Sequence, residues 1–229
     1  MRFQDASPDA RAIVYAGIQA DPLVARAAAL LADASHAERV LARAVMNGES
    51  TDPNAWRTMF PGLFGSFAAA ADAARADRAE AILAASLAVA DRGEAARSQY
   101  RGAIVESLTE TLLRRHFPGA APSAVRRERR ILFDGVRAEI HPYDVTVELP
   151  GQAAAIDCKW GARGISGDVL HQLDDARAHA EEEDERLAAF LVVFDADLSC
   201  RVRLERATAP SESTELVTIE TLDRLAAAG

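Results

Sequence analysis

The spacing of apolar residues changes from helical to strand-like along this 229-residue chain. Over roughly the first 95 residues, apolar side chains recur at helical spacing between short polar breaks. Asp21-Pro22 and Asp52-Pro53 indicate helix starts, because aspartate caps a helix and proline suits its first position. The pattern therefore predicts a bundle of about five short helices in residues 1–95, and no strand.

One part of this helical region carries most of its large apolar side chains: Trp56, Met59, Phe60, Leu63, Phe64 and Phe67. We interpret this cluster as the core of the bundle or its seam with the second half of the chain. A docking surface for a partner protein is the alternative.

From residue 97 onwards the pattern alternates between helical and strand periods. Asp134-Gly135 and Pro150-Gly151 are turn signals that join consecutive strands. The predicted elements are a helix over 97–117, strands over 124–133, 136–140, 143–149 and 153–160, a helix over 168–187, and a strand over 188–195. A strand over 216–219 and a helix over 221–228 would follow. We therefore expect residues 96–229 to form an α/β domain with a mixed sheet flanked by helices.

The distribution of charge bears on possible partners. The chain has a net charge of −9, but residues 97–137 hold nine arginines and four acidic residues, a net charge of +5. An acidic protein does not coat nucleic acid indiscriminately, yet a local basic face can still bind phosphates. The candidates are Arg101, Arg126, Arg127, Arg129 and Arg130. A solvated strand edge protected by charge is the alternative interpretation of the last four.

Two features of the composition predict the compartment. No run of about 18 uncharged apolar residues occurs, and the N-terminus lacks the apolar stretch of a secretory signal. The two cysteines, Cys158 and Cys200, lie in or beside apolar strand-like segments and are expected to be reduced packing residues. We therefore expect a cytoplasmic protein without a membrane segment.

The strongest chemical signal is Lys159, the single lysine among 26 basic residues. Asp157 lies two residues earlier on the same predicted strand, so both side chains share a face. Asp144 lies on the polar side of the preceding strand, which the Pro150-Gly151 turn makes a neighbour. Two carboxylates held close together favour a divalent, oxygen-seeking cation such as Mg²⁺ or Mn²⁺. Lysine is a compact donor whose pKa can be shifted, which arginine does not offer.

This arrangement resembles the PD-(D/E)xK nuclease superfamily. Pro142-Tyr143-Asp144 matches the first half of the motif with one inserted residue, and Asp157-Cys158-Lys159 matches the second half. Glu106 on the preceding helix matches an acid that many members use as a further metal ligand, and Gln172 matches a glutamine on the following helix. The tyrosine that often lies four residues after that glutamine is replaced by Ala176.

The resemblance implies a restriction-endonuclease-like fold for residues 96–229 and Mg²⁺- or Mn²⁺-dependent hydrolysis of DNA. Asp144, Asp157 and Glu106 would then be metal ligands, Lys159 the catalytic amine, and Gln172 a contact to the attacking water or the scissile phosphate. His141 and Glu148 flank these positions and are more typical of structural or solvated residues.

Several alternatives stay open. RNA is an alternative to DNA, and a catalytically inactive subunit that uses the fold for binding or assembly is an alternative to an enzyme. By analogy, a nuclease domain joined to a helical domain suggests a restriction or anti-phage defence effector. Residues 1–95 would then bind a partner protein, regulate the nuclease or form a homodimer.

Overall fold

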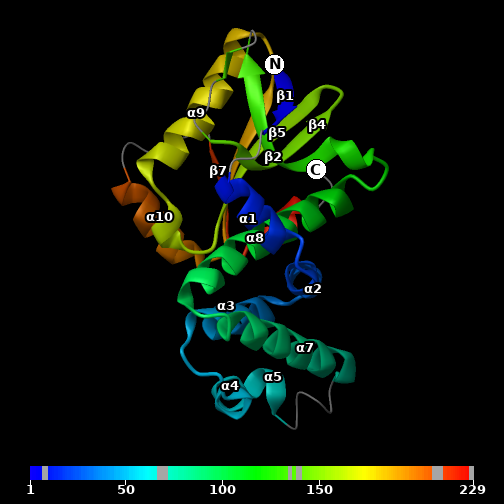
Figure 1. Cartoon of the computed structure of the whole chain (residues 1–229), viewed down its shortest axis with the longest axis vertical. Helices are drawn as coiled ribbons and strands as arrows, with labels where there is room; N and C mark the ends of the chain where they lie inside the picture. Colours follow the sequence, from blue (N-terminus) through cyan, green and yellow to red (C-terminus); the bar gives the residue numbers. More distant parts are fainter. Residues whose placement is uncertain (7–9, 66–71, 134–135, 138–140, 208–213, 227–229) are drawn as a thin grey trace. The chain divides into compact units, whose positions relative to one another are not determined.

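The computed structural model describes residues 1–6, 10–65, 72–133, 136–137, 141–207 and 214–226. The chain divides into two compact units, one of residues 10–108 and one of residues 1–9 and 109–229. Helix α8 (Glu94–His116) runs from the first unit into the second (Figure 1). The division therefore falls inside a helix, whereas the sequence predicted a boundary near residue 95. No helix among the described residues is long and apolar enough to cross a membrane.

The first unit consists of helices. Besides the first part of α8 they are α1 (Ala10–Gln19), α2 (Pro22–Ala32), α3 (His36–Asn47), α4 (Pro53–Met59), α5 (Pro61–Phe64) and α7 (Ala73–Ala90). Both predicted helix starts are confirmed, because Asp21 and Asp52 accept hydrogen bonds from the amides of Leu23 and Asn54. Helix α7 packs against α2 and α3. Of the large apolar cluster, Trp56 and Leu63 are buried and Met59 is exposed.

A fully buried carboxylate joins α3 to α7. Glu38 accepts hydrogen bonds from the amide and hydroxyl of Ser35, in a capping box, and from Arg78 on α7 at 3.0 Å. Burial alone would raise the pKa of Glu38, but the Ser35 hydrogen bonds and the Arg78 guanidinium outweigh it and lower the pKa below 4.5. Ionised Glu38 therefore stabilises the helical unit.

Replacing Glu38 with glutamine should lower the free energy of unfolding by about 2–3 kcal/mol at pH 7. Because the pKa of Glu38 is lowered in the folded state, its contribution is complete above pH 4.5 and is lost as pH falls through the folded value. Urea unfolding at pH 7 and pH 3 should show a smaller deficit at pH 3 than at pH 7. Glu80→Gln, which removes an exposed carboxylate paired with Arg57, is the matched control. An equal deficit at both pH values would contradict the proposed role of the charge.

The second unit is built on a seven-stranded sheet with the order β1-β2-β4-β5-β6-β7, and β3 pairs with β2 outside this order. Its strands are β1 (Arg2–Asp5), β2 (Val125–Phe133), β3 (Val136–Arg137), β4 (Tyr143–Leu149), β5 (Gln152–Lys159), β6 (Leu187–Val193) and β7 (Glu215–Val217). Pairing is antiparallel from β1 to β5 and parallel from β5 to β7. The predicted α/β class with a mixed sheet is confirmed.

Helices cover both faces of this sheet. Helix α9 (Gly167–Glu182) packs on β2, β5 and β6, where its apolar residues share a core with Ala155 (Figure 1). The last turns of α8 lie over the other face, where Thr109 contacts Cys158, and Leu113 and Ala154 line the same pocket. Successive strand residues point to opposite faces, so β5 contributes to both cores. Helix α10 (Asp197–Arg206) and the 3₁₀ turns η1 (Pro122–Ala124), η2 (Ala162–Gly164) and η3 (Leu222–Leu225) complete the unit.

Several predicted elements need correction. Residues 2–5 form an edge strand, although only helices were predicted before residue 95. Helix α9 ends at Glu182, because Asp184 adopts a left-handed backbone with φ of 56° before β6 begins. Helix α10 was not predicted, and the buried Cys200 lies in it rather than beside a strand.

The end of the chain differs as well, because a 3₁₀ turn, η3, replaces the described part of the predicted terminal helix. The predicted Asp134-Gly135 turn and Phe67 lie outside the described residues.

Candidate active site

The β4–β5 hairpin brings Asp144 and Asp157 together. Gly151 turns the chain with a φ of 73°, and the two strands pair up to Val145 and Ile156. Asp144 and Asp157 are the next residues in the same register. There the ladder gives way to a side-chain contact, in which the Cys158 amide donates a 2.6 Å hydrogen bond to Asp144 Oδ2. The carboxylate of Asp144 is thus fixed beside the end of β5.

Lys159 joins these two carboxylates. Its ammonium forms an ion pair with Asp157, and its Nζ lies 3.8 Å from Asp144 Oδ2. Asp157 is buried and Lys159 is half-buried. Burial alone would lower the pKa of Lys159, but the attraction of Asp144 and Asp157 outweighs it and raises the pKa above its ordinary value. Lys159 is therefore a fixed cation in this structure.

The residues around Lys159 hold its backbone and its side-chain stem. The Phe194 amide donates a 2.8 Å hydrogen bond to the Lys159 carbonyl, and the Phe194 ring stacks on Trp160. On the other side, a Cβ at Gly164 would lie 3.0 Å from Lys159 Cβ. Glycine at 164 therefore lets turn η2 pack closely on the stem of the lysine.

Glu128 is an acid at this site that the sequence prediction missed. It lies in β2 between Arg127 and Arg129, which pair with Val145 and Tyr143, so it faces Asp144 across the β2–β4 pair. Its backbone is left-handed, with φ of 56°, inside a strand. One carboxylate oxygen of Glu128 and one of Asp144 lie within 4.8 Å of each other. The left-handed backbone of Glu128 costs a non-glycine residue about 1–3 kcal/mol, and backbone strain of this kind is found most often at functional sites.

Two substitutions at Glu128 separate backbone strain from chemistry. Glu128→Gly should be more stable to urea than Glu128→Ala by about 1 kcal/mol, because glycine adopts a positive φ without steric cost. Both variants remove the carboxylate, so the difference in stability between them reports on the backbone alone. Equal stability of the two variants would contradict a strained backbone at this position.

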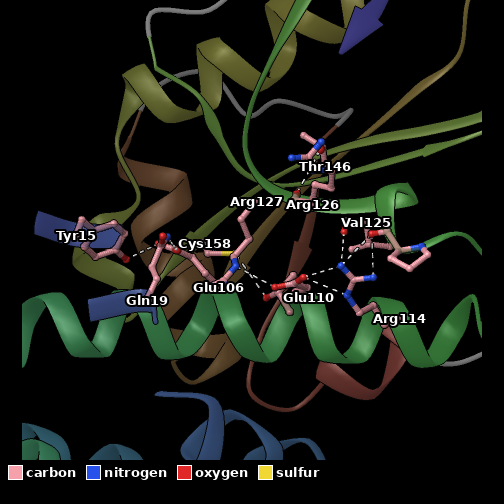
Figure 2. Close-up of polar contacts among 12 residues, drawn as sticks. Tyr15, Gln19, Glu106, Glu110, Arg114, Val125, Arg126, Arg127, Thr146 and Cys158 are labelled. Carbon is pink, nitrogen blue, oxygen red and sulfur yellow. Dashed lines mark hydrogen bonds and ion pairs between the residues drawn. The ribbon is translucent and has the colours of Figure 1, made fainter. Parts of the chain in front are cut away.

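Glu106 lies on the part of α8 that belongs to the helical unit, where its carboxylate is buried and held by α1. The Tyr15 hydroxyl donates a hydrogen bond to one carboxylate oxygen of Glu106 (Figure 2). The side-chain amide of Gln19 donates a 2.7 Å hydrogen bond to the other. A Cβ at Gly102 would lie 3.0 Å from the Tyr15 hydroxyl, so this glycine lets α1 approach α8 closely. The sequence prediction named neither Tyr15 nor Gln19, because it included no helix before Asp21.

Gln172, His141 and Glu148 make structural contacts. The Gln172 side chain donates a 3.1 Å hydrogen bond to the His141 carbonyl, and the Gln172 carbonyl accepts one from the Tyr143 hydroxyl. Gln172 thus ties α9 to the segment that leads into Asp144. Glu148 pairs with Arg129 at 2.7 Å.

Most of the candidate phosphate-binding arginines pair with acidic residues of the chain. Arg126 pairs with Asp5, and Arg129 with both Asp5 and Glu148. Figure 2 shows Arg127 pairing with Glu110, which Arg114 also binds. Arg101 pairs with Glu94 in the helical unit, and Arg130 is half-buried in β2. The outer part of Arg126 is exposed.

No protein-family model, curated protein or solved structure matches this chain. The interpretation of the site therefore depends on its geometry and chemistry.

Proposed function

We propose that this protein is a metal-dependent nuclease of the PD-(D/E)xK type that hydrolyses phosphodiester bonds in DNA. The observation that carries the proposal is the cluster of Asp144, Asp157 and Lys159 at the end of the β4–β5 hairpin. Carboxylates placed to bind a cation, next to a cationic donor, suit a reaction in which negative charge develops on phosphate oxygens.

The donor set suits a divalent cation. Asp144 and Glu128 offer oxygens within 4.8 Å of each other, and such neighbouring carboxylates repel unless a cation lies between them. We propose that Asp144 and Glu128 each contribute one carboxylate oxygen to Mg²⁺ or Mn²⁺, with Asp157 as a further ligand. Glu106 stays the additional ligand that the family resemblance implies. A bound divalent ion polarises the phosphodiester and lowers the pKa of a coordinated water.

Glu106 is included only because of the resemblance to the PD-(D/E)xK superfamily. Tyr15 and Gln19 would act as positioning residues that orient its carboxylate.

The remaining residues have distinct roles in this proposal. Lys159, held as a cation by two carboxylates, would donate to a non-bridging phosphate oxygen and stabilise its growing charge. Gln172 would position the segment before Asp144 rather than touch the substrate. Arg126, whose side chain is 44% exposed, is the candidate phosphate contact on β2.

The wider biological role is proposed by analogy alone. A nuclease unit joined to a unit of helices fits a restriction or anti-phage defence effector, in which the helices bind a partner protein or a second copy of the chain. A catalytically inactive binding subunit of the same fold is the second candidate, and RNA is the alternative substrate.

A cleavage assay tests the proposed activity. Supercoiled plasmid and single-stranded DNA and RNA would be incubated with the wild type, Asp157→Ala and Lys159→Ala in Mg²⁺, Mn²⁺ or EDTA. Asp168→Ala is the matched control, because Asp168 is an exposed acid in the first turn of the nearby α9. We expect metal-dependent cleavage by the wild type and the control only. Cleavage by all four proteins would contradict the site, and no cleavage by the wild type would favour the inactive subunit.

A further inference from the structure

A basic groove lies between helix α10 and turn η2. Its volume is about 450 Å³, and the described residues that line it include Arg163, Arg203 and Arg206 but no acidic residue. In a chain whose net charge is −9, this local excess of positive charge favours an anionic ligand.

One face of α10 presents apolar and basic side chains to the groove. Leu198, Val202 and Arg206 follow one another at a spacing of four and form a continuous stripe that lines the groove. Asp197 lies on another side of the helix, where it pairs with Arg201, and Glu205 borders the stripe without lining the groove.

Two of the three arginines are available to a ligand. Arg163 and Arg206 are exposed, and neither forms a hydrogen bond or ion pair with another residue in the part of the chain that the structure describes. Arg203 uses its Nε to bind the Ile165 carbonyl at 3.1 Å. Leu198, 75% exposed, adds an apolar surface between these charges.

The groove adjoins the candidate active site through η2. Ala162 and Arg163 line the groove, while Gly164, the last residue of the same turn, packs against the stem of Lys159. One 3₁₀ turn rises by about 6 Å, so the groove begins roughly one turn of chain from the lysine. A polyanion lying in the groove would therefore extend towards Lys159.

We propose that this groove binds the phosphate backbone of the nucleic-acid strand on one side of the cleaved bond. Arg163, Arg203 and Arg206 contact phosphates, and Leu198 and Val202 pack against sugars and bases. This assignment builds on the proposed nuclease function and adds a strand-binding surface to it.

The test measures binding without cleavage. Fluorescence anisotropy of a labelled 20-nucleotide single-stranded DNA, and of the matching RNA, would be followed in EDTA for the wild type and Arg163→Ala/Arg206→Ala. The matched control is Arg186→Ala/Arg201→Ala, which also removes two exposed arginines from this unit but lies outside the groove. We expect the groove variant to bind at least about tenfold more weakly than the control, with a salt-dependence slope smaller by about 1.4.

The possible outcomes separate this proposal from the nuclease proposal. Equal affinities of the two double variants for the labelled strands would overturn the proposal that the groove binds nucleic acid, whatever the cleavage assay shows. Weaker binding by the groove variant would support it even if no cleavage occurs. Preferential binding of the wild type to phosphatidylserine vesicles over DNA and RNA would overturn it in favour of a membrane surface. If the double variant does not fold, Arg163→Ala and Arg206→Ala singly should each weaken binding about threefold or more.

Discussion

Replacing Asp144 with asparagine should lower metal-dependent DNA cleavage by about a thousandfold or more. Asparagine keeps the size of the side chain and an oxygen that can still accept the hydrogen bond from the Cys158 amide. It loses the negative charge that would hold the metal. A bound cation contributes several kcal/mol to such reactions, and each 1.36 kcal/mol changes the rate tenfold.

The control for Asp144→Asn is Asp168→Asn, a change of the same kind on the exposed start of α9. Initial cleavage rates measured at several Mg²⁺ and Mn²⁺ concentrations would separate weaker metal binding from slower chemistry. A rate within tenfold of the wild type at saturating metal would contradict the role of Asp144 as a ligand.

Replacing Lys159 with methionine should lower the free energy of unfolding by about 2–4 kcal/mol at pH 7. Methionine fills the space of the stem but leaves Asp144 and the buried Asp157 without their cation. Two neighbouring carboxylates without a cation repel each other, and binding of protons removes this repulsion. The deficit would therefore be full near neutral pH and shrink as pH falls towards 4.

Urea unfolding at pH 7 and pH 4, with and without Mn²⁺, tests this prediction. Mn²⁺ should restore part of the stability, because a divalent ion can replace the missing charge. Lys159→Met/Asp157→Asn should also be more stable than Lys159→Met alone. Lys159→Arg keeps the charge, so it should lose less stability while still losing cleavage. A stability loss that depends on neither pH nor Mn²⁺ would show that only packing was disturbed.

The sequence pattern predicted the core of the candidate site because its geometry is local. Asp157 and Lys159 are two apart on one strand, and a tight turn determines which residue of β4 lies opposite Asp157. The same reasoning predicted the mixed sheet, since alternating residues mark β4 and a continuous apolar run marks β6.

The features that were missed depend on distant parts of the chain. β1 is a strand because β2, more than a hundred residues later, offers it an edge. Glu128 reaches the site through a left-handed backbone that no pattern of residue types indicates. The arginines of β2 looked available to phosphates, but their acidic partners come from β1, α8 and β4.

Direct measurement of Mn²⁺ binding tests the central claim, that these carboxylates form a divalent-metal site. Free and bound Mn²⁺ would be quantified by electron paramagnetic resonance in the wild type, Asp144→Asn, Glu128→Gln and the control Asp168→Asn. The proposal predicts at least one Mn²⁺ bound by the wild type and the control. In Asp144→Asn and Glu128→Gln it predicts a large loss of Mn²⁺ affinity. The loss should exceed the roughly 10–100-fold that is typical when a residue that only supports a metal ligand is changed. Unchanged Mn²⁺ binding in Asp144→Asn and Glu128→Gln would contradict it.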